Sequence, residues 1–295
     1  MPQEDISIVI PAHNEAEGLR LLLPALCSEY PGAEIIVVDD GSTDETAAVC
    51  EQFPVRHIRH PCNMGNGAAI KTGARNAGRD IIVFMDADGQ HDFSEIPALL
   101  EKLEAGYDMV VGARSAGSHA TLPRRLANMI YNRLASVMTG YDIRDLTSGF
   151  RAARRRHFIR FLYLLPNGFS YPTTSTMAFF RSGLPVGYVP IQARKRSGKS
   201  HIRIFRDGLR FFIIILKIGA LFSPMRLFLP ISALLFVIGL SYYGYTYSVS
   251  GRFTNMSALI LLSSLFTFLM GIMAEFISSL HYKGTEEDQH TGRRS

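Results

Sequence analysis

The sequence of 295 residues has no tryptophan and only three cysteines, Cys27, Cys50 and Cys62. An odd number of cysteines without a Cys-x-x-Cys spacing argues against a disulfide scaffold and a thiolate metal site, and it fits a reducing compartment. The 25 glycines and 14 prolines are too few for a collagen-like chain. A disordered chain is excluded as well, because 47% of the residues are hydrophobic and the net charge is only +5.

Two common nucleotide-binding motifs are also missing. The first strand-like run is followed by Pro-Ala-His-Asn-Glu at residues 11–15 instead of Gly-x-Gly-x-x-Gly, and the chain has no Walker sequence. A glycine-rich turn at residues 65–67 lacks the Gly-Lys-Ser ending of a phosphate-binding loop. Two interpretations of this turn stay open: it starts an ordinary helix, or it lets Lys71 approach a ligand.

The sequence does have two long apolar segments towards its C-terminus. Residues 227–249 carry no charge, and residues 256–280 carry only Glu275. A membrane helix needs about 20 apolar residues, so both segments can cross a bilayer, and the short connection at residues 250–255 predicts a helical hairpin. The alternative interpretation is a pair of core helices in a soluble protein.

Basic residues are concentrated beside the first apolar segment. Residues 194–226 contain nine Lys and Arg residues and one acidic residue, Asp207, whereas the connection between the apolar segments has only Arg252. By the positive-inside rule, both chain ends should face the cytoplasm, and no secretory leader opens the chain. Residues 204–222 mix apolar side chains with cations, which predicts an amphipathic helix at the membrane surface; a core helix is the alternative.

Together these patterns predict a multi-pass protein of the cytoplasmic membrane. We expect the bilayer as a partner and no nucleic acid. The predicted parts are a cytosolic domain at residues 1–203, an interfacial helix at 204–222, two transmembrane helices at about 227–249 and 256–280 within 223–282, and a cytoplasmic tail at 283–295.

The N-terminal region alternates strand-like and helix-like patterns. Short apolar runs rich in β-branched residues occur at residues 6–10, 35–38, 81–85 and 109–111. Strands this apolar are typical of a parallel sheet that is covered on both faces. Helices are expected near residues 43–51, 66–77 and 93–105, the first and last opened by capping-box spacings that start at Ser42 and Asp92. The pattern predicts an α/β fold with a mostly parallel sheet and flanking helices.

Short segments rich in polar residues follow each of these runs, and parallel strands bring such segments to one crevice at the carboxyl edge of the sheet. They are Pro11, Ala12, His13, Asn14 and Glu15 after the first run, Asp39 and Asp40 after the second, Asp86, Ala87, Asp88 and Gln90 after the third, and Arg114 after the fourth.

Asp86 and Asp88 are two positions apart at a strand end, so both carboxylates can turn towards one cation. Carboxylate oxygens favour Mg²⁺ or Mn²⁺, and Gln90 can supply a further oxygen. Such an ion neutralises a diphosphate and stabilises the charge on a leaving nucleotide. The alternative is that one carboxylate only caps the next helix, a role that Asp92 fits better.

Three blocks, at residues 7–15, 37–46 and 84–91, resemble the signature sequences of glycosyltransferase family 2. The block Asp-Leu-Thr-Ser-Gly-Phe-Arg at residues 145–151 is similar to the one that marks the polyprenyl-phosphate branch of that family, which holds the dolichol-phosphate mannose synthases. The resemblance implies a GT-A fold, a nucleotide-sugar donor and an inverting transfer to a polyprenyl phosphate such as undecaprenyl or dolichyl phosphate.

The resemblance, together with the strand-end pattern, gives each candidate residue an expected role. Asp88 and Arg114 are expected to act in catalysis, and Asp86, Asp88 and Gln90 to bind the metal. The residues expected to bind the nucleotide sugar are Pro11, Ala12, Asn14, Glu15, Asp39, Asp40, Lys71, Asp86, Ala87, Asp88 and Gln90. The residues expected to bind the acceptor phosphate are Arg114, Arg124, Arg125, Ser148, Arg194, Arg196 and Lys199.

Two departures from the family pattern limit what the resemblance implies. His201 stands where a lysine is usual in the loop at residues 197–201, so the cation that closes over the donor stays open. The segment at residues 170–176 lacks the acid found there in mannose synthases, so neither mannose nor GDP is carried over, and a UDP sugar is favoured.

The expected chemistry relies on position and charge more than on a base. A phosphate monoester has a second pKa of about 6, so the phosphate oxygen that attacks the sugar is already mostly anionic at neutral pH. Positioning and electrostatic stabilisation should therefore dominate the rate. Arginines suit this task because they hold phosphate bidentately.

Other functions stay open as alternatives. One is a membrane glycosyltransferase with another lipid or glycan acceptor, and another is a non-catalytic scaffold that binds nucleotide sugars. A processive polysaccharide synthase is disfavoured, because the chain has no tryptophan for a Gln-x-x-Arg-Trp motif. A flippase or a transferase that uses lipid-linked sugars is the expected downstream partner, and self-association is left open.

Overall fold

The structure is a computed structural model that describes residues 3–89, 91–114, 122–168, 171–192 and 223–291, with backbone only at 122–128 and 281–291. The chain divides into two compact units. The first comprises Met1–Arg133 and Asp142–Ile204, and the second comprises Leu134–Tyr141 and Phe205–Ser295. The predicted interfacial helix at residues 204–222 lies outside the described residues.

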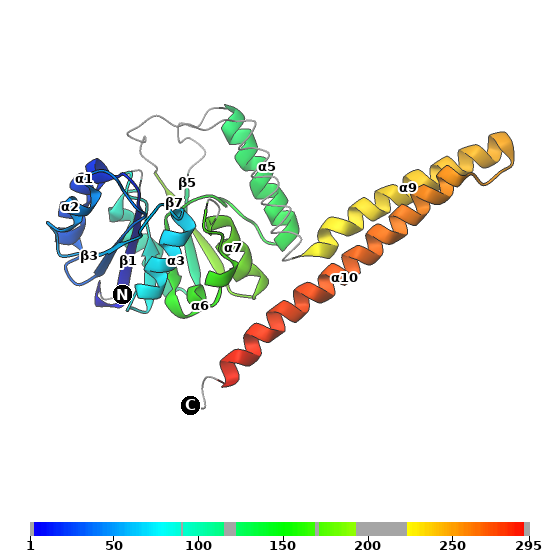
Figure 1. Cartoon of the computed structure of the whole chain (residues 1–295). Helices are drawn as coiled ribbons and strands as arrows, with labels where there is room; N and C mark the ends of the chain where they lie inside the picture. The colour runs from blue at the N-terminus through cyan, green and yellow to red at the C-terminus, as the bar shows by residue number, and fades with distance from the viewer. Residues whose placement is uncertain (1–2, 90, 115–121, 169–170, 193–222, 292–295) are drawn as a thin grey trace. The chain divides into compact units, whose positions relative to one another are not determined.

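A seven-stranded sheet forms the centre of the first unit (Figure 1), in the order β3-β2-β1-β4-β6-β5-β7. All neighbouring strands are parallel except β6, which is antiparallel to both β4 and β5. The strands are β1 Ile6–Ala12, β2 Glu34–Asp39, β3 Arg56–Arg59, β4 Ile81–Phe84, β5 Met109–Arg114, β6 Arg151–Arg154 and β7 Val186–Ile191.

Helices cover both faces of this sheet. The apolar side chains of α1 and α4 pack with Ile6, Ile8 and Ile10 of β1 on one face. On the other face, the Cγ1 atom of Val9 lies against α3, and the ring of Phe158 of α6 packs at a tilt against Phe84 with ring centroids 4.6 Å apart. The helices are α1 Ala16–Glu29, α2 Thr46–Cys50, α3 Asn66–Asn76, α4 Ile96–Glu104, α5 Leu122–Thr139, α6 Arg155–Arg160 and α7 Tyr171–Arg181, with 3-10 turns η1 Gln3–Asp5, η2 Phe93–Glu95 and η3 Leu162–Leu164.

The antiparallel strand β6 shapes the edge where the candidate site lies. Because β1, β2, β4 and β5 run in the same direction, their carboxyl ends lie at one edge of the sheet. β6 runs the other way between β4 and β5, and its first residue, Arg151, is in register with Phe84 and Val111 near that edge. The loop that precedes β6, residues 145–150, is therefore inserted between the ends of β4 and β5.

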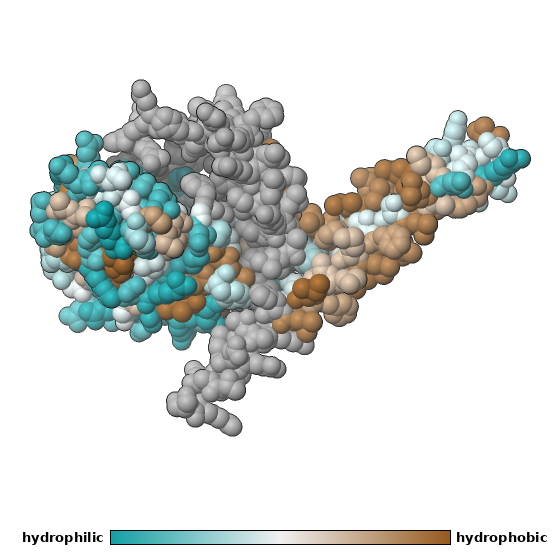
Figure 2. All heavy atoms as spheres, in the orientation of Figure 1, coloured by the Kyte–Doolittle hydropathy of each residue, from teal (hydrophilic) through white to brown (hydrophobic). Residues whose placement is uncertain are grey.

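The second unit contains an antiparallel helical pair, α9 Pro224–Ser250 and α10 Asn255–Thr291. Both helices are long and apolar enough to cross a membrane, and the visible surface of the pair is mostly hydrophobic (Figure 2). Small residues recur at every seventh position on the buried seam, a spacing typical of left-handed helix packing. They are Ser232, Gly239 and Thr246 on α9 and Ser257, Ser264, Gly271 and Ser278 on α10.

Polar contacts also join the two helices. The hydroxyl of Ser232 donates to the carbonyl of Ser264 at 3.1 Å, and the hydroxyl of Ser264 donates to the carbonyl of Ser232 at 2.9 Å. At the start of α9, the Met225 N–H donates to a carboxylate oxygen of Glu275 at 3.2 Å. Glu275, the one charge in the second apolar segment, thus satisfies a free helix-end N–H.

The sequence predictions were right for the four apolar strands and for the hairpin, and incomplete elsewhere. β3, β6 and β7 were not predicted. The expected capping box that starts at Ser42 was wrong: α2 begins at Thr46, whose N–H donates to Asp44 Oδ1 at 3.0 Å. The capping role expected of Asp92 is confirmed, since its carboxylate accepts from the Ser94 N–H at 3.0 Å.

Candidate active site

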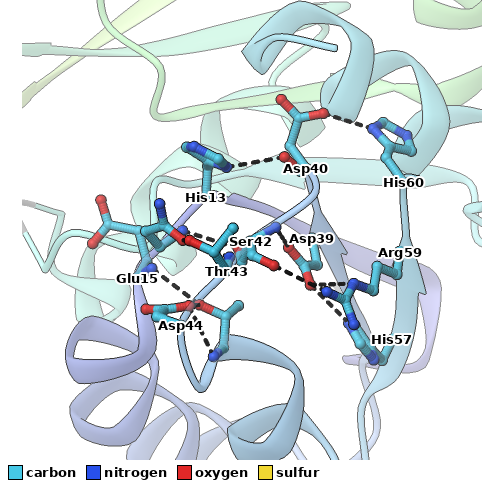
Figure 3. A network of polar contacts seen from close by, with 12 residues as sticks. His13, Glu15, Asp39, Asp40, Ser42, Thr43, Asp44, His57, Arg59 and His60 are labelled. Atoms are coloured by element: carbon cyan, nitrogen blue, oxygen red, sulfur yellow. Dashed lines mark hydrogen bonds and ion pairs between the residues drawn. The ribbon is translucent and has the colours of Figure 1, made fainter. Parts of the chain in front are cut away.

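The loops that follow β1 and β2 are joined by hydrogen bonds (Figure 3). Asn14 adopts a left-handed backbone conformation with φ of 55°, which asparagine tolerates better than most residues. Its N–H donates to the Ser42 hydroxyl at 2.9 Å, and its side-chain oxygen accepts from the Thr43 N–H at 2.8 Å. The Glu15 N–H donates to the Thr46 hydroxyl at 3.1 Å. Asn14 and Glu15 thus hold together the two loops beside the buried Ala12.

Asp39 is fully buried at the end of β2. Its Oδ1 accepts from the Ser42 N–H at 2.7 Å. Its Oδ2 has no hydrogen-bond partner among the described residues and lies 3.5 Å from Arg59 Nε and 3.8 Å from His57 Nε2. A buried acceptor without a partner is costly, and the nearby Arg59 and His57 offset part of this cost; binding of Asp39 to a nucleotide stays a prediction.

Asp40 has a different set of partners. Its Oδ1 accepts from His60 Nδ1 at 2.7 Å and from the Met64 N–H at 2.9 Å, and its Oδ2 accepts from the Gly65 N–H at 2.7 Å. Burial alone would raise the pKa of Asp40, but the hydrogen bonds from His60, Met64 and Gly65 outweigh it and lower the pKa. Asp40 therefore holds the turn that leads into α3, and binding to a nucleotide stays a prediction for it.

Lys71 and the glycine-rich turn at residues 65–67 contact the segment that follows η3. Lys71 Nζ donates to the Leu165 carbonyl at 3.1 Å and to the Asn167 side chain. The Ala68 N–H, in the first turn of α3, donates to the Asn167 carbonyl at 2.9 Å. A Cβ on Gly67 would lie 2.0 Å from the Pro166 carbonyl oxygen. These contacts favour the interpretation of the turn as an ordinary helix start.

The Asp-x-Asp pair follows β4 at the same edge. Asp86 and Asp88 are partly exposed, and Ala87 between them is buried. Asp86 Oδ2 lies 3.4 Å from His91 Nε2 and close to the backbone of Gly149. Two hard carboxylates next to a close-fitting backbone suit a divalent cation. Gln90 lies outside the described residues, and within the described part of the chain no three His, Cys, Asp or Glu side chains cluster as a metal site.

Arg114, at the end of β5, is held by Asp145. Arg114 Nε and Nη2 donate to the two carboxylate oxygens of Asp145 at 2.8 and 3.0 Å, and Nη2 also donates to the Thr147 hydroxyl. Burial would raise the pKa of Asp145, but the hydrogen bonds and charge of Arg114 outweigh it and lower the pKa. Burial alone would lower the pKa of Arg114. The hydrogen bond and charge of Asp145 and the charge of Asp86 outweigh burial, so the pKa of Arg114 is raised. Arg114 is therefore a cation held in place by Asp145, at the same sheet edge as Asp86.

The other residues expected to bind the acceptor phosphate are less well placed. Ser148 is buried, and its N–H donates to Asp145 Oδ1 at 3.1 Å. Arg124 and Arg125 lie in the first turn of α5, where only the backbone is described. Arg194, Arg196 and Lys199 lie outside the described residues.

Sequence reasoning missed three functional neighbours of these residues. Asp145 opens the block at residues 145–151, but its role as the partner of Arg114 was not predicted, and the available signal was its place in that block. His91 and Gly149 were not singled out, because their contacts with Asp86 depend on how β6 enters the sheet.

The fold and the groups at its carboxyl edge together define a class of enzyme. A mostly parallel α/β sheet with an Asp-x-Asp pair and an ion-paired arginine at its carboxyl edge is the arrangement of a GT-A-type glycosyltransferase. Residues 7–162, just over half of the chain, match the sequence model of glycosyl transferase family 2. The chain belongs to glycosyltransferase family 2. Residues 223–280 match the GtrB C-terminal hairpin, in agreement with a membrane protein.

Two curated relatives match about two thirds or more of the chain. The polyprenol monophosphomannose synthase of Mycolicibacterium smegmatis is 31% identical over 66% of this chain and 79% of its own length. The undecaprenyl-phosphate 4-deoxy-4-formamido-L-arabinose transferase of Photorhabdus laumondii is 28% identical over 94% of this chain and 89% of its own.

A solved structure confirms the predicted GT-A fold. Glucosyl-3-phosphoglycerate synthase from Mycobacterium tuberculosis, in complex with Mn²⁺, UDP and phosphoglyceric acid, superposes with a TM-score of 0.58 at 20% identity. The match covers 72% of this chain and 78% of that structure. At this identity the similarity concerns the fold.

Proposed function

We propose that the protein transfers a sugar from a nucleotide sugar, with a UDP sugar favoured, to a polyprenyl phosphate in the membrane. The observation that most supports this is the Arg114–Asp145 ion pair at the same sheet edge as Asp86, on a chain that also has a membrane hairpin. Anion-binding and cation-binding groups at one edge suit two phosphate-bearing substrates. The relatives named for polyprenol and undecaprenyl phosphate support the choice of acceptor.

The donor would bind between the loops after β1 and β2. Pro11, Ala12 and Asn14 form one side of this region, and the buried Asp39 offers Oδ2 as an acceptor to an N–H or O–H of the nucleoside. The fixed loop geometry around Asn14 keeps this acceptor in place, which lowers the entropy lost on binding.

Asp86 and Asp88 would hold Mg²⁺ or Mn²⁺, with Gln90 as a further candidate. Bound there, the ion would neutralise the diphosphate and stabilise the leaving nucleotide. The Mn²⁺ that accompanies UDP in the synthase of similar fold supports a divalent ion.

Arg114 would position the acceptor. Asp145 engages Nε and Nη2, so among the described residues Nη1 is the nitrogen that remains for a phosphate oxygen. The acceptor phosphate is already mostly anionic at neutral pH, because its second pKa is about 6. A fixed guanidinium beside the donor therefore lowers the repulsion between two anions and aligns the attacking oxygen with the anomeric carbon.

A direct attack by this oxygen would invert the anomeric configuration. We also propose that both chain ends and the catalytic unit face the cytoplasm, from the excess of basic residues beside the first span. NMR of the lipid product, compared with the donor sugar, tests the inversion: retained configuration would contradict a single displacement.

The test of the metal site compares three aspartate variants of the full-length protein. Asp86→Ala and Asp88→Ala should each lower divalent-dependent transfer to polyprenyl phosphate by about 100-fold or more, on the order of a lost charge contact at a reacting centre. Asp92→Ala is the matched control, because Asp92 caps η2 and should leave turnover within a few-fold. Unchanged turnover in both Asp86 and Asp88 variants would remove the metal from the mechanism.

A further inference from the structure

The ring of His91 lies between Asp86 and the hydrophobic core, and the proposed function gives it no role. His91 is 7% exposed and lies flat against Phe150, with ring centroids 5.1 Å apart and an interplanar angle of 13°. Phe150 is fully buried in the core beneath the site. The core therefore fixes the plane of the His91 ring, and with it the direction of Nε2 towards Asp86.

The contact between His91 and Asp86 fits one tautomer of the imidazole. An ionised carboxylate only accepts hydrogen bonds, so Nε2 must bear the proton for the contact to be attractive. His91 Nδ1 is buried and has no hydrogen-bond partner among the described residues. At 3.4 Å the contact of Nε2 with Oδ2 is longer than a normal hydrogen bond, so it leaves the carboxylate oxygens able to bind a cation.

Gly149 closes the other side of the Asp86 carboxylate. A Cβ at this position would lie 2.8 Å from Asp86 Oδ2 and 3.3 Å from Oδ1. The backbone around Gly149 is held from both directions: its carbonyl accepts from the Tyr171 hydroxyl at 3.1 Å, and the Ser148 carbonyl accepts from Arg151. A methyl group at residue 149 would therefore move the carboxylate and not the loop.

We propose that His91 and Gly149 are positioning residues that hold Asp86 in one orientation for a divalent cation. His91 sets the direction of Oδ2 through its Nε2–H, and Gly149 gives the space in which the carboxylate lies. The inference rests on the proposed role of Asp86 as a metal ligand. Groups that orient a ligand in this way typically change metal affinity by about 10- to 100-fold when they are lost.

The test measures Mn²⁺ affinity directly, by electron paramagnetic resonance of free Mn²⁺ with the full-length protein and UDP. His91→Phe keeps a ring against Phe150 and removes the Nε2–H, and Gly149→Ala fills the space beside Asp86. Both should weaken Mn²⁺ binding by about 10- to 100-fold, and His91→Gln, which restores a donor, should recover part of the loss. Gly78→Ala is the matched glycine control, because its Cβ would meet only ordinary contacts of 3.5 Å or more.

Kinetics separate positioning from a general loss of structure. In His91→Phe and Gly149→Ala, the KM for Mn²⁺ should rise while kcat at saturating Mn²⁺ stays within a few-fold of the unmodified protein. Mn²⁺ affinity within about twofold of the unmodified protein in both variants, with Asp86→Ala abolishing binding, would overturn this inference alone. Unchanged Mn²⁺ affinity in Asp86→Ala would overturn the proposed metal site and this inference with it.

Discussion

Asp145→Asn tests whether the ion pair that fixes Arg114 matters for both folding and transfer. The substitution keeps the shape of the side chain and removes its charge. Asp145 is 7% exposed, and its carboxylate accepts from Arg114, Thr147 and Ser148. An amide can offer only one oxygen to these donors, and its NH₂ group faces another donor.

The expected magnitude follows from burial. Removing one partner of a buried ion pair typically costs about 3–5 kcal/mol. The side chain of Arg114 is 27% exposed, so it can regain some hydration, and we expect a loss of about 2–3 kcal/mol in the free energy of unfolding. A guanidinium that is no longer held should lower kcat/KM by about 10- to 100-fold, since each tenfold corresponds to about 1.4 kcal/mol.

The pH dependence has a defined sign. The folded-state pKa of Asp145 is lowered, so its contribution to stability is fully present above the unfolded pKa of about 4 and is lost as pH falls through the folded value. The difference in stability between the two proteins should therefore shrink below about pH 4.

The assay is thermal unfolding in detergent together with transfer kinetics. Asp142→Asn is the matched control, because Asp142 pairs with Arg144 while its side chain is 81% exposed, and such pairs contribute little. If Asp145→Asn behaved like Asp142→Asn in both stability and kcat/KM, the assignment of Asp145 as the holder of Arg114 would be wrong.

Two further substitutions test the turn before α3 and the hairpin seam. Asp40→Asn removes the carboxylate that accepts hydrogen bonds from His60 and two backbone N–H groups. It should lower the free energy of unfolding by about 1–3 kcal/mol. An unchanged melting temperature would contradict this role of Asp40. Ser232→Ala combined with Ser264→Ala should destabilise the helical pair by about 1 kcal/mol, measured by unfolding in sodium dodecyl sulfate, and no change would mean that packing alone joins the helices.

The sequence was sufficient for the parts of the fold that have long apolar patterns. Strands buried on both faces, such as β1 and β2, leave runs of β-branched residues, and the hairpin helices leave long uncharged segments. β3 and β6 could not be predicted, because their sequences, Arg-His-Ile-Arg and Arg-Ala-Ala-Arg, show no apolar strand pattern. Here tertiary contacts decide the structure over local propensity.

Arg151 shows why such a strand escapes sequence reasoning. It is an arginine with 0% exposure, which composition rules place at the surface. Its guanidinium donates to the Pro172 carbonyl and to the Ser175 and Thr176 hydroxyls at 2.8–3.2 Å, and it lies over the Tyr171 ring. Except for the Ser148 carbonyl, these partners lie twenty or more residues away in the sequence, so no local pattern predicts the burial of this charge.

The residues of the candidate site also fall into two groups, those that the sequence suggests and those that it does not. Asp86, Asp88 and Arg114 lie at or just after the ends of strands, and the sequence motifs suggest them as candidates. The groups that hold them in place, Asp145 for Arg114 and His91 with Gly149 for Asp86, become visible only once β6 is inserted between β4 and β5. Candidate residues for the chemistry can thus be proposed from the sequence, whereas the side chains that hold them in place are found only from the fold.

The most direct test of the account is the mass of the lipid formed by the purified full-length protein. It would be supplied with a mixed pool of nucleotide sugars, a divalent cation, and equal amounts of undecaprenyl phosphate and diacylglycerol. The account predicts undecaprenyl phosphate that has gained a single sugar, and no product without the cation. A sugar found on diacylglycerol instead, or binding of nucleotide sugars without any lipid product, would contradict it.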